Sequence, residues 1–296
     1  MASCPICKQK SSLFLSTKDY NRRITPLSFN YYRCSSCGLI FLFPIPADID
    51  IYYPQNYYSL PGSIKQLVEA AKSERYKIDM IKKYISHGRL LEIGPAFGSF
   101  VYLAKEAGFE TDAIEMNTDC CTFIRDTIGV RTINSNNPVE ALKEVGNYDV
   151  IALWHVIEHL PDPWSVLDII SKKLHPGGVL VIAAPNPAAL QFRLLSRYWP
   201  HVDAPRHVML FPLELIRSHL ISCGLTPFFS TTNDRGGLGW NAFGWQYALS
   251  NPFTNRYVKF AMRQLGTVIT WAFIPWERKE LQGAAYTLIA RKGEAT

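Results

Sequence analysis

The chain has 296 residues, of which 48% are apolar and 19% are charged, so we expect a packed globular protein and exclude extensive disorder. Its 31 basic and 25 acidic side chains give a formal charge of +6 without any Lys/Arg-rich run, which argues against a nucleic-acid partner. An apolar signal region is absent from the N-terminus, and no window holds the roughly 18 uncharged apolar residues of a membrane span, so a cytoplasmic location is expected.

Two cysteine pairs with two-residue gaps begin the chain: Cys4, Cys7, Cys34 and Cys37. Such a gap lets both sulfurs of one tight turn face a single ion, and two turns complete a closed tetrahedral site. The four thiolates therefore predict one structural zinc, with four ordinary reduced cysteines as the alternative. Gly38 suits the positive φ that such a turn needs after its second cysteine, whereas Lys8 at the matching place does not.

We expect three segments along the chain. Residues 1–45 form the zinc-ribbon segment, and residues 46–62 form a linker whose many prolines stop regular structure. Residues 63–296 form the main domain, with inserts at about 186–210 and 233–282. Apolar residues at helical spacing predict one helix over residues 63–86, which leads into this domain.

From Arg89 onward, short apolar runs alternate with helical stretches. The expected strands are LLEI, TDAIE, VRTI, YDVIALW and VLVIAA, followed by an antiparallel closing pair, TPFFSTT and AAYTLIARK. This alternation predicts an α/β fold with a doubly wound, mostly parallel, seven-stranded Rossmann-like sheet. Ligands of such sheets bind at the carboxyl ends of the strands, near the point where the strand order reverses.

The turn after the first strand, EIGPAFGS, is the expected ligand site. A dinucleotide fingerprint needs G-x-G-x-x-G, but after Gly94 the other two positions hold Ala96 and Ser99. An E-x-G-x-x-x-G pattern remains: Glu92, Gly94 and Gly98. Glu115 ends the second strand at the separation, about 20 residues, where a carboxylate meets ribose hydroxyls. A ribose without a pyrophosphate is therefore expected, and S-adenosylmethionine fits that description.

This pattern, together with DVIALWHVIEHLPDP and LHPGG downstream, resembles the class I S-adenosylmethionine-dependent methyltransferases over roughly residues 63–292. The resemblance implies that Glu92 and the Gly94–Gly98 turn cradle the methionine moiety, and that Glu115 binds both ribose hydroxyls. The paired cysteines and the Tyr/Pro-rich linker resemble a subgroup whose members often modify sugars or other small metabolites.

Trp154 and His155 follow the fourth strand, where the resemblance implies a place near cofactor and substrate. The same stretch, HVIEH, matches a metalloprotease signature that requires one helix through both histidines. Because Pro161 and Pro163 interrupt any such helix, we set the protease aside. For His159 we expect a hydrogen-bonded packing role.

The stretch DAPRHVMLF, after the fifth strand, resembles a segment of the same subgroup and supplies the catalytic candidates. Methyl transfer to a hydroxyl needs a base, and His207 titrates near neutrality, so it is our first candidate, with His201 a weaker one. Asp203 and Arg206 are expected to contact substrate. The alternative is an Asp–Arg–His network that anchors the loop.

The second insert is rich in Trp and Phe, and a lid or core packing is its default role. Residues 257–276 also suit a surface helix that contacts a membrane or a lipid-linked substrate. The sequence does not indicate an oligomeric state.

Together these features predict an S-adenosylmethionine-dependent methyltransferase of a small metabolite, with a sugar, a nucleotide-sugar or a lipid-linked saccharide among the candidate acceptors. One alternative is a nicotinamide-dependent oxidoreductase, which Ala96 and Ser99 disfavour. The other is a zinc-ribbon module that binds RNA or a protein and methylates that partner.

Overall fold

The computed structural model describes residues 2–54 and 57–294, so part of the predicted linker, residues 55–56, lies outside the described residues. Its main sheet has seven strands in the order β11-β12-β9-β8-β5-β6-β7. They are β5 (Gly88–Ile93), β6 (Phe109–Glu115), β7 (Arg131–Asn134), β8 (Tyr148–Trp154), β9 (Leu174–Pro185), β11 (Leu225–Thr231) and β12 (Ala285–Lys292). Strand β12 is antiparallel to both of its neighbours, while β5 to β9 pair in parallel. The predicted doubly wound, mostly parallel sheet is confirmed.

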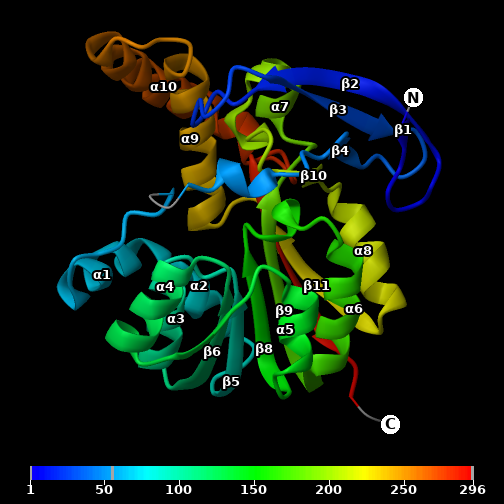
Figure 1. Ribbon diagram of the computed structural model, residues 1–296, viewed down its shortest axis with the longest axis vertical. Helices are drawn as coiled ribbons and strands as arrows, with labels where there is room; N and C mark the ends of the chain where they lie inside the picture. Colours follow the sequence, from blue (N-terminus) through cyan, green and yellow to red (C-terminus); the bar gives the residue numbers. More distant parts are fainter. Residues whose placement is uncertain (1, 55–56, 295–296) are drawn as a thin grey trace.

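Helices cover both faces of this sheet (Figure 1). One face holds α5 (Pro138–Lys143), α6 (Pro163–Lys173) and α8 (Leu213–Ser222). The other side holds α1 (Ile64–Ala71), α2 (Arg75–Ile81), α3 (Ser99–Glu106) and α4 (Thr118–Phe123). With both faces covered, the central strands must be apolar on both sides, as the buried runs of β8 and β9 are.

The single helix predicted over residues 63–86 is divided in the structure. A 3-10 turn at Lys72–Glu74 separates α1 from α2. Leu67 on α1 packs with Val101 in one apolar cluster, while Ile78 on α2 packs with Phe100 in another. The apolar spacing in the sequence indicates that α1 and α2 are each amphipathic. The break between them depends on the positions of the two apolar clusters on which they pack, and the spacing does not contain that information.

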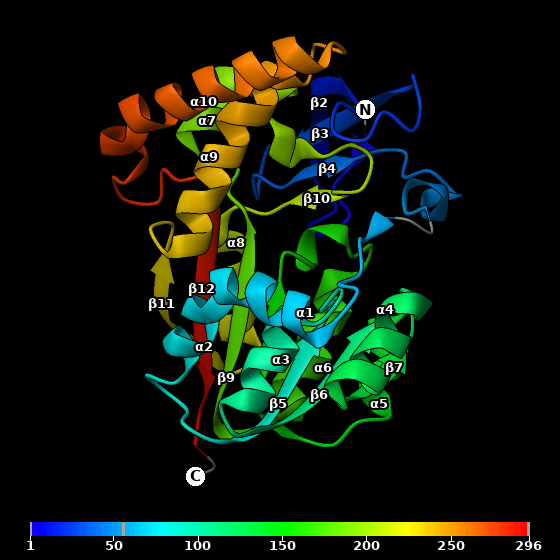
Figure 2. The same ribbon diagram turned by 90° about the vertical axis from the view of Figure 1, so that its left-hand side faces the viewer.

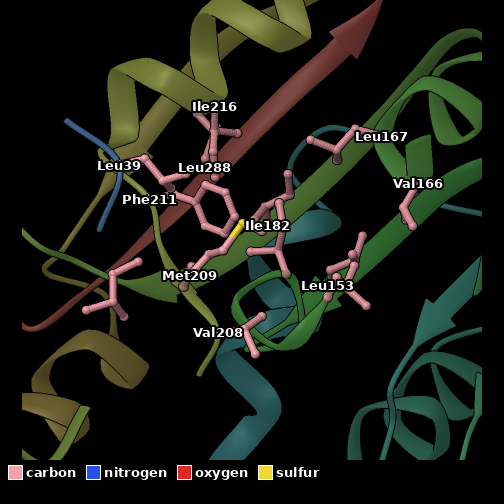
Figure 3. Close-up of a cluster of buried hydrophobic side chains, with 14 of the residues drawn as sticks. Leu39, Leu153, Val166, Leu167, Ile182, Val208, Met209, Phe211, Ile216 and Leu288 are labelled. Carbon is pink, nitrogen blue, oxygen red and sulfur yellow. The ribbon is translucent and has the colours of Figure 1, made fainter. Parts of the chain in front are cut away.

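The N-terminal residues form a second sheet, of five antiparallel strands, at one end of the molecule (Figure 1). Its strands are β1 (Ala2–Ser3), β2 (Lys10–Lys18), β3 (Ser28–Cys34), β4 (Ile40–Leu42) and β10 (Met209–Leu210). The last of these comes from the segment after β9, so this sheet is completed by a distant part of the chain. Figure 3 shows Leu39 beside Phe211 and Leu288, and the two sheets share one apolar core.

Segments that leave the carboxyl edge of the main sheet build the rest of that end of the molecule (Figure 2). The short helix α7 (Leu190–Leu195) follows β9, and the long helices α9 (Arg235–Ser250) and α10 (Arg256–Glu277) lie between β11 and β12. The two predicted inserts therefore form the surroundings of the sheet's carboxyl edge.

Across residues 2–54 and 57–294, no helix has both the length and the apolar character needed to cross a bilayer.

Candidate active site

The order of strands in the main sheet reverses between β5 and β8, which lie side by side with Ile93 paired to Leu153. Chain segments leaving these two strands diverge to opposite sides, so a binding site forms where their carboxyl ends meet. The turn beginning at Gly94 and the segment beginning at His155 both start there. The residues predicted to hold the cofactor are therefore brought together by the topology.

The turn after β5 requires glycine at two positions. Gly94 and Gly98 have φ values of +70° and +83°, which L side chains rarely adopt. A Cβ atom on Gly94 would lie 2.5 Å from Cγ2 of Val156, and one on Gly98 would lie 2.8 Å from Cδ1 of Ile128. Glycine is thus required at both positions, by the backbone conformation and by the lack of room for a side chain. At Gly94 the turn packs against Val156, in the segment that follows β8.

Glu115 is held in place by the backbone of this turn. Its Oε2 accepts a hydrogen bond from the backbone N–H of Ala96 at 3.0 Å, and its Oε1 accepts one from Asn117 at 2.8 Å. Each carboxylate oxygen retains a further lone pair for a hydroxyl group. Burial and the charge of Glu115 raise the pKa of Tyr58, so a linker tyrosine lies close to the same carboxylate. The sequence did not single out Tyr58, and only its place in a Tyr-rich segment hinted at it.

Glu92 is buried at the end of β5 with one oxygen unpaired. Burial raises its pKa to about 8, although the nearby positive charge of Lys77 opposes this shift. Its Oε2 has no hydrogen-bond partner within residues 2–54 and 57–294. Lys77 donates to Glu74 at 2.7 Å instead. An orphaned buried carboxylate oxygen is suited to a cation, so the ammonium group of an amino-acid moiety fits here.

Trp154 and His155 take opposite directions at the end of β8. The indole of Trp154 packs against Phe100 at a centroid distance of 5.6 Å, in the apolar cluster that also holds Ile78 of α2. His155 has a φ of +58° and turns towards Trp240 of α9, 4.7 Å away. Burial and the charge of Lys77 lower the pKa of His155 to about 3, so the ring is neutral. Trp240 was not predicted, because no local pattern relates α9 to β8.

His207 lies in a cluster of titratable groups. Its Nδ1 is 2.8 Å from the carbonyl oxygen of His201, and a carbonyl can only accept, so Nδ1 carries the proton. The lone pair of the neutral ring is therefore on Nε2, which is 4.0 Å from Oε1 of Glu158. Burial lowers the pKa of His207. The ring is neutral at neutral pH and has a basic nitrogen available.

Glu158 is fully buried, and burial raises its pKa. Neither of its carboxylate oxygens has a hydrogen-bond partner in the part of the chain that the structure describes. It lies in one 3-10 turn, Ile157–His159, so no α-helix carries the two histidines of HVIEH, as the rejection of the protease motif requires. Glu158 was not among the predicted site residues, although a glutamate next to Ile157 just after a strand was a usable signal.

His159 has the hydrogen-bonded packing role that the sequence suggests. Its Nδ1 lies 2.9 Å from the hydroxyl of Tyr53 and 3.1 Å from the carbonyl oxygen of Arg206. Its ring also contacts that of His207, with centroids 4.6 Å apart. Tyr53 comes from the predicted linker, which therefore contributes to this site.

Arg206 does not face an open site, which disagrees with its predicted substrate contact, whereas Asp203 is only half-buried and its substrate contact stays a prediction. Arg206 has no exposed surface, and its Nε donates to Asp203 at 2.9 Å while its Nη2 donates to Asp19 at 2.7 Å. Burial by itself raises the pKa of the Asp203 carboxyl, but the Arg206 guanidinium beside it outweighs this effect and holds that pKa well below its usual value. His201 is engaged as well, with Nε2 3.0 Å from the carbonyl oxygen of Trp240. These bonds favour the alternative in which Asp203 and Arg206 anchor the loop.

The four paired cysteines converge at the end of the N-terminal sheet where β1 and β3 finish. Their Sγ atoms are 3.7 Å apart in Cys4 and Cys37, 3.4 Å in Cys7 and Cys34, and 3.7 Å in Cys7 and Cys37. A tetrahedral zinc with bonds of about 2.3 Å places its sulfurs about 3.8 Å apart. The thiols therefore have nearly the separations that a zinc ion requires.

The two cysteine turns have the same backbone geometry. The N–H of Lys8 donates to the carbonyl of Cys4 at 3.1 Å, and that of Gly38 donates to Cys34 at 3.2 Å. Lys8 adopts a φ of +60° despite its side chain, beside +74° for Gly38. A non-glycine residue accepts this conformation at a cost of about 1–2 kcal/mol. The prediction that Lys8 is unsuited to such a turn is therefore wrong, because its backbone adopts the same left-handed conformation as Gly38.

Comparisons with known proteins agree with this geometry. Residues 66–226 match the family described as "Methyltransferase domain". The "Ubiquinone biosynthesis O-methyltransferase" of Ruegeria pomeroyi is 28% identical over 187 residues, 59% of this chain and 73% of that protein. The protein of the same name from Cereibacter sphaeroides is 26% identical over 188 residues, 60% of this chain and 74% of that protein.

Among solved structures, an S-adenosylmethionine-dependent methyltransferase from Archaeoglobus fulgidus has the same fold, with a TM-score of 0.50 and 21% identity over 75% of this chain and 94% of that one. The family match covers more than half of the chain, and it includes the glycine turn, Glu115 and the end of β8. The protein belongs to the class I S-adenosylmethionine-dependent methyltransferases.

Proposed function

We propose that the protein transfers a methyl group to a hydroxyl of a small metabolite, with His207 as the general base. S-adenosylmethionine, when bound, supplies a methyl group attached to a positively charged sulfur. A hydroxyl becomes a strong nucleophile only as it loses its proton, and Nε2 of His207 is the group that would accept it. The observation that carries this proposal is the bond from Nδ1 of His207 to the His201 carbonyl, which directs the lone pair to Nε2.

Binding of the cofactor is assigned to the residues at the ends of β5, β6 and β8. Glu115 would accept hydrogen bonds from both ribose hydroxyls, since the backbone already fixes its carboxylate. The Gly94–Gly98 turn and Glu92 would hold the amino-acid moiety, whose ammonium group matches the unpaired Glu92 oxygen. His155 would border the methyl group, while Trp154, the other residue expected there, packs in the core behind it. Orientation of the reacting atoms in line, with water excluded, then accounts for most of the rate enhancement.

The acceptor is proposed to be a ring with a flat apolar face, such as a sugar, a nucleotide-sugar or a lipid-linked saccharide. Next to His155, Trp240 contacts Phe243 at a centroid distance of 5.4 Å, and Phe243 stacks on Tyr247 at 4.2 Å. Aromatic faces of this kind bind the apolar face of a ring. Transfer to oxygen is supported by the relatives, which are named O-methyltransferases.

The test is methyl transfer itself. The protein is incubated with S-adenosylmethionine labelled in the methyl group and with sugars, nucleotide-sugars, lipid-linked saccharides and phenols in turn. Labelled product and S-adenosylhomocysteine should form with a hydroxyl-bearing acceptor and with no acceptor in which that hydroxyl is already methylated. In parallel, calorimetry should detect binding of S-adenosylhomocysteine and none of NAD. Binding of NAD alone would favour the oxidoreductase and overturn the proposal.

The N-terminal cysteines are proposed to hold one structural zinc. Burial raises the pKa of Cys34, but N–H groups of Cys37 and Ser36 donate to its sulfur and lower the pKa to about 6 overall. A thiolate is thus favoured at Cys34, whereas burial raises the pKa of Cys4 and Cys37. Elemental analysis should find about one zinc per chain, lost in Cys34→Ser and kept in Cys223→Ser, whose thiol lies outside the cluster. A metal-free wild-type protein with an intact N-terminal sheet would contradict this.

A further inference from the structure

Helix α10 carries a long apolar stripe on its exposed face. Trp271 is 72% exposed and Phe260 is 66% exposed, far more than is usual for side chains of this size. The stripe consists of large apolar residues at helical spacing: Tyr257, Phe260, Leu265, Val268, Trp271 and Trp276. A 22-residue helix extends over about 33 Å, so the stripe is a continuous surface rather than scattered side chains.

The opposite face of α10 is packed firmly, so the exposure of the stripe is a property of the fold. A Cβ atom on Gly266 would lie 2.5 Å from Cα of Gln246, which shows how closely α10 crosses α9. At its end, the buried Glu277 accepts hydrogen bonds from Trp245 at 2.9 Å and from Gln191 at 2.7 Å. In Figure 2 the helix lies across the end of the molecule, with its outer side free of other elements.

The charge around the stripe has one sign. No Asp or Glu occurs from Arg235 to Trp276, whereas Arg256, Lys259 and Arg263 all lie on α10. Arg256 and Arg263 are exposed. Cationic side chains beside exposed Trp, Phe and Leu are the composition of helices that lie flat in a membrane interface, where tryptophan and tyrosine are also enriched.

We propose that this stripe binds the surface of an anionic lipid bilayer, with α10 parallel to the membrane plane. Its apolar residues would enter the boundary between head groups and acyl chains, and its arginines would meet lipid phosphates. A second copy of the chain is the competing occupant. It fits less well because the stripe has no acidic residue with which the arginines of a symmetric partner could pair.

The proposal goes beyond the methyl-transfer function and also affects how an acceptor arrives. Helix α9 joins α10 to the site, since Trp240 on α9 contacts His155. With α10 on a membrane, α9 would lead from the lipid surface to the site, since α10 packs on Gln246 and Trp240 lies beside His155. An acceptor dissolved in or linked to lipid could then reach the methyl group without crossing bulk water.

The test compares cosedimentation of the full chain with vesicles rich in phosphatidylglycerol and with vesicles of phosphatidylcholine alone. We expect at least about tenfold tighter binding to the anionic vesicles, decreasing with added salt. Phe260→Glu with Trp271→Glu should weaken this binding at least about tenfold, because charges are excluded from the acyl boundary. Arg256→Gln with Arg263→Gln should remove the preference for anionic lipid.

Ile221→Glu on α8 is the matched control, since Ile221 is 63% exposed but lies outside the stripe; its binding should stay within about twofold of wild type. S-adenosylhomocysteine binding and thermal unfolding verify that each variant is folded. Equal vesicle binding by wild type and the Phe260/Trp271 variant would overturn the proposal, as would no binding by wild type. A wild-type dimer in sedimentation velocity that this variant dissociates would assign the stripe to a second copy instead.

Discussion

Two groups of buried ionisable side chains in this protein differ in how they are paired. Arg206 is enclosed by Asp203 and Asp19, so its charge is balanced within the chain. Glu92 and Glu158 are just as buried, yet they retain oxygens with no hydrogen-bond partner in residues 2–54 and 57–294. Close to the Glu158 carboxylate lie histidine nitrogens, with Nδ1 of His155 3.5 Å from its Oε1. A buried charge with all its partners stabilises a particular arrangement of segments, whereas one without partners costs stability and is typical of functional sites.

The positions of the two groups agree with this distinction. Arg206 ties the segment after β9 to Asp19 in the N-terminal region, so it fixes the N-terminal sheet against the main one. Glu92 ends β5, and Glu158 follows β8, where the strand order reverses and a ligand is expected. For Arg206, Glu92 and Glu158, the presence or absence of bonded partners therefore distinguishes structural residues from site residues better than the type of side chain does.

The largest effect should come from breaking the paired group. Arg206→Ala leaves Asp19 and Asp203 buried without their cation, and we expect the free energy of unfolding to fall by about 3–5 kcal/mol. Urea denaturation measures this. Arg217→Ala is the control, because Arg217 pairs with Glu214 at the surface, and its loss should stay below about 1 kcal/mol. Similar losses in both variants would remove the distinction between framework and surface pairs.

The second effect concerns Glu115, whose two carboxylate oxygens each accept one backbone hydrogen bond and keep a lone pair for a ligand. Glu115→Ala removes two proposed charge-assisted bonds to ribose hydroxyls, so affinity for S-adenosylmethionine should fall by about 2–4 kcal/mol. Calorimetric titration measures it, and Glu140→Ala, an exposed glutamate on α5, should bind as wild type does. Unchanged affinity in Glu115→Ala would refute the ribose assignment.

The third prediction separates catalysis from anchoring at His207. His207→Asn should retain cofactor affinity while turnover per folded molecule falls about 100-fold, equivalent to about 2.7 kcal/mol in the barrier. Because burial lowers the pKa of His207, wild-type activity should be lost only as the pH falls below about 6.5, where the ring gains a proton. Near-normal turnover with reduced thermal stability would instead mean that His207 only holds its loop.

The smallest effect is a change in the pH dependence of stability. Burial raises the pKa of Glu92 to about 8, so the folded state binds a proton that the unfolded state loses near pH 4.5. Without cofactor, the wild-type protein should lose stability as the pH rises from about 5 to 8, because only the folded state still binds that proton in this range. Glu92→Gln should lack this part of the slope in urea denaturation, and Glu140→Gln should keep it. Equal slopes in wild type and Glu92→Gln would mean that Glu92 is not protonated in the fold.

Several features of the site could be predicted because they depend on short spacings. The glycine turn, its neighbouring Glu92 and the acid at the end of the next strand lie within one β-α-β unit, so their geometry is nearly complete locally. The same holds for the cysteine turns, where each pair forms its own hydrogen-bonded loop. For Arg206 the sequence left substrate contact and loop anchoring both open, because the deciding partner, Asp19, is 187 residues away along the chain.

By itself, the sequence determined the α/β alternation, the strand-ending acids and the two cysteine turns, because apolar period, glycine conformation and two-residue gaps act within a few residues of each other. Only the tertiary structure decided that β10 completes the N-terminal sheet and that Trp240 meets His155. It also decided that Glu158 is buried with no hydrogen-bond partner among the residues that the structure describes. These contacts join segments separated by long stretches of chain. Whether a polar group is paired or orphaned depends on what the packed interior places beside it, and no local pattern contains that information.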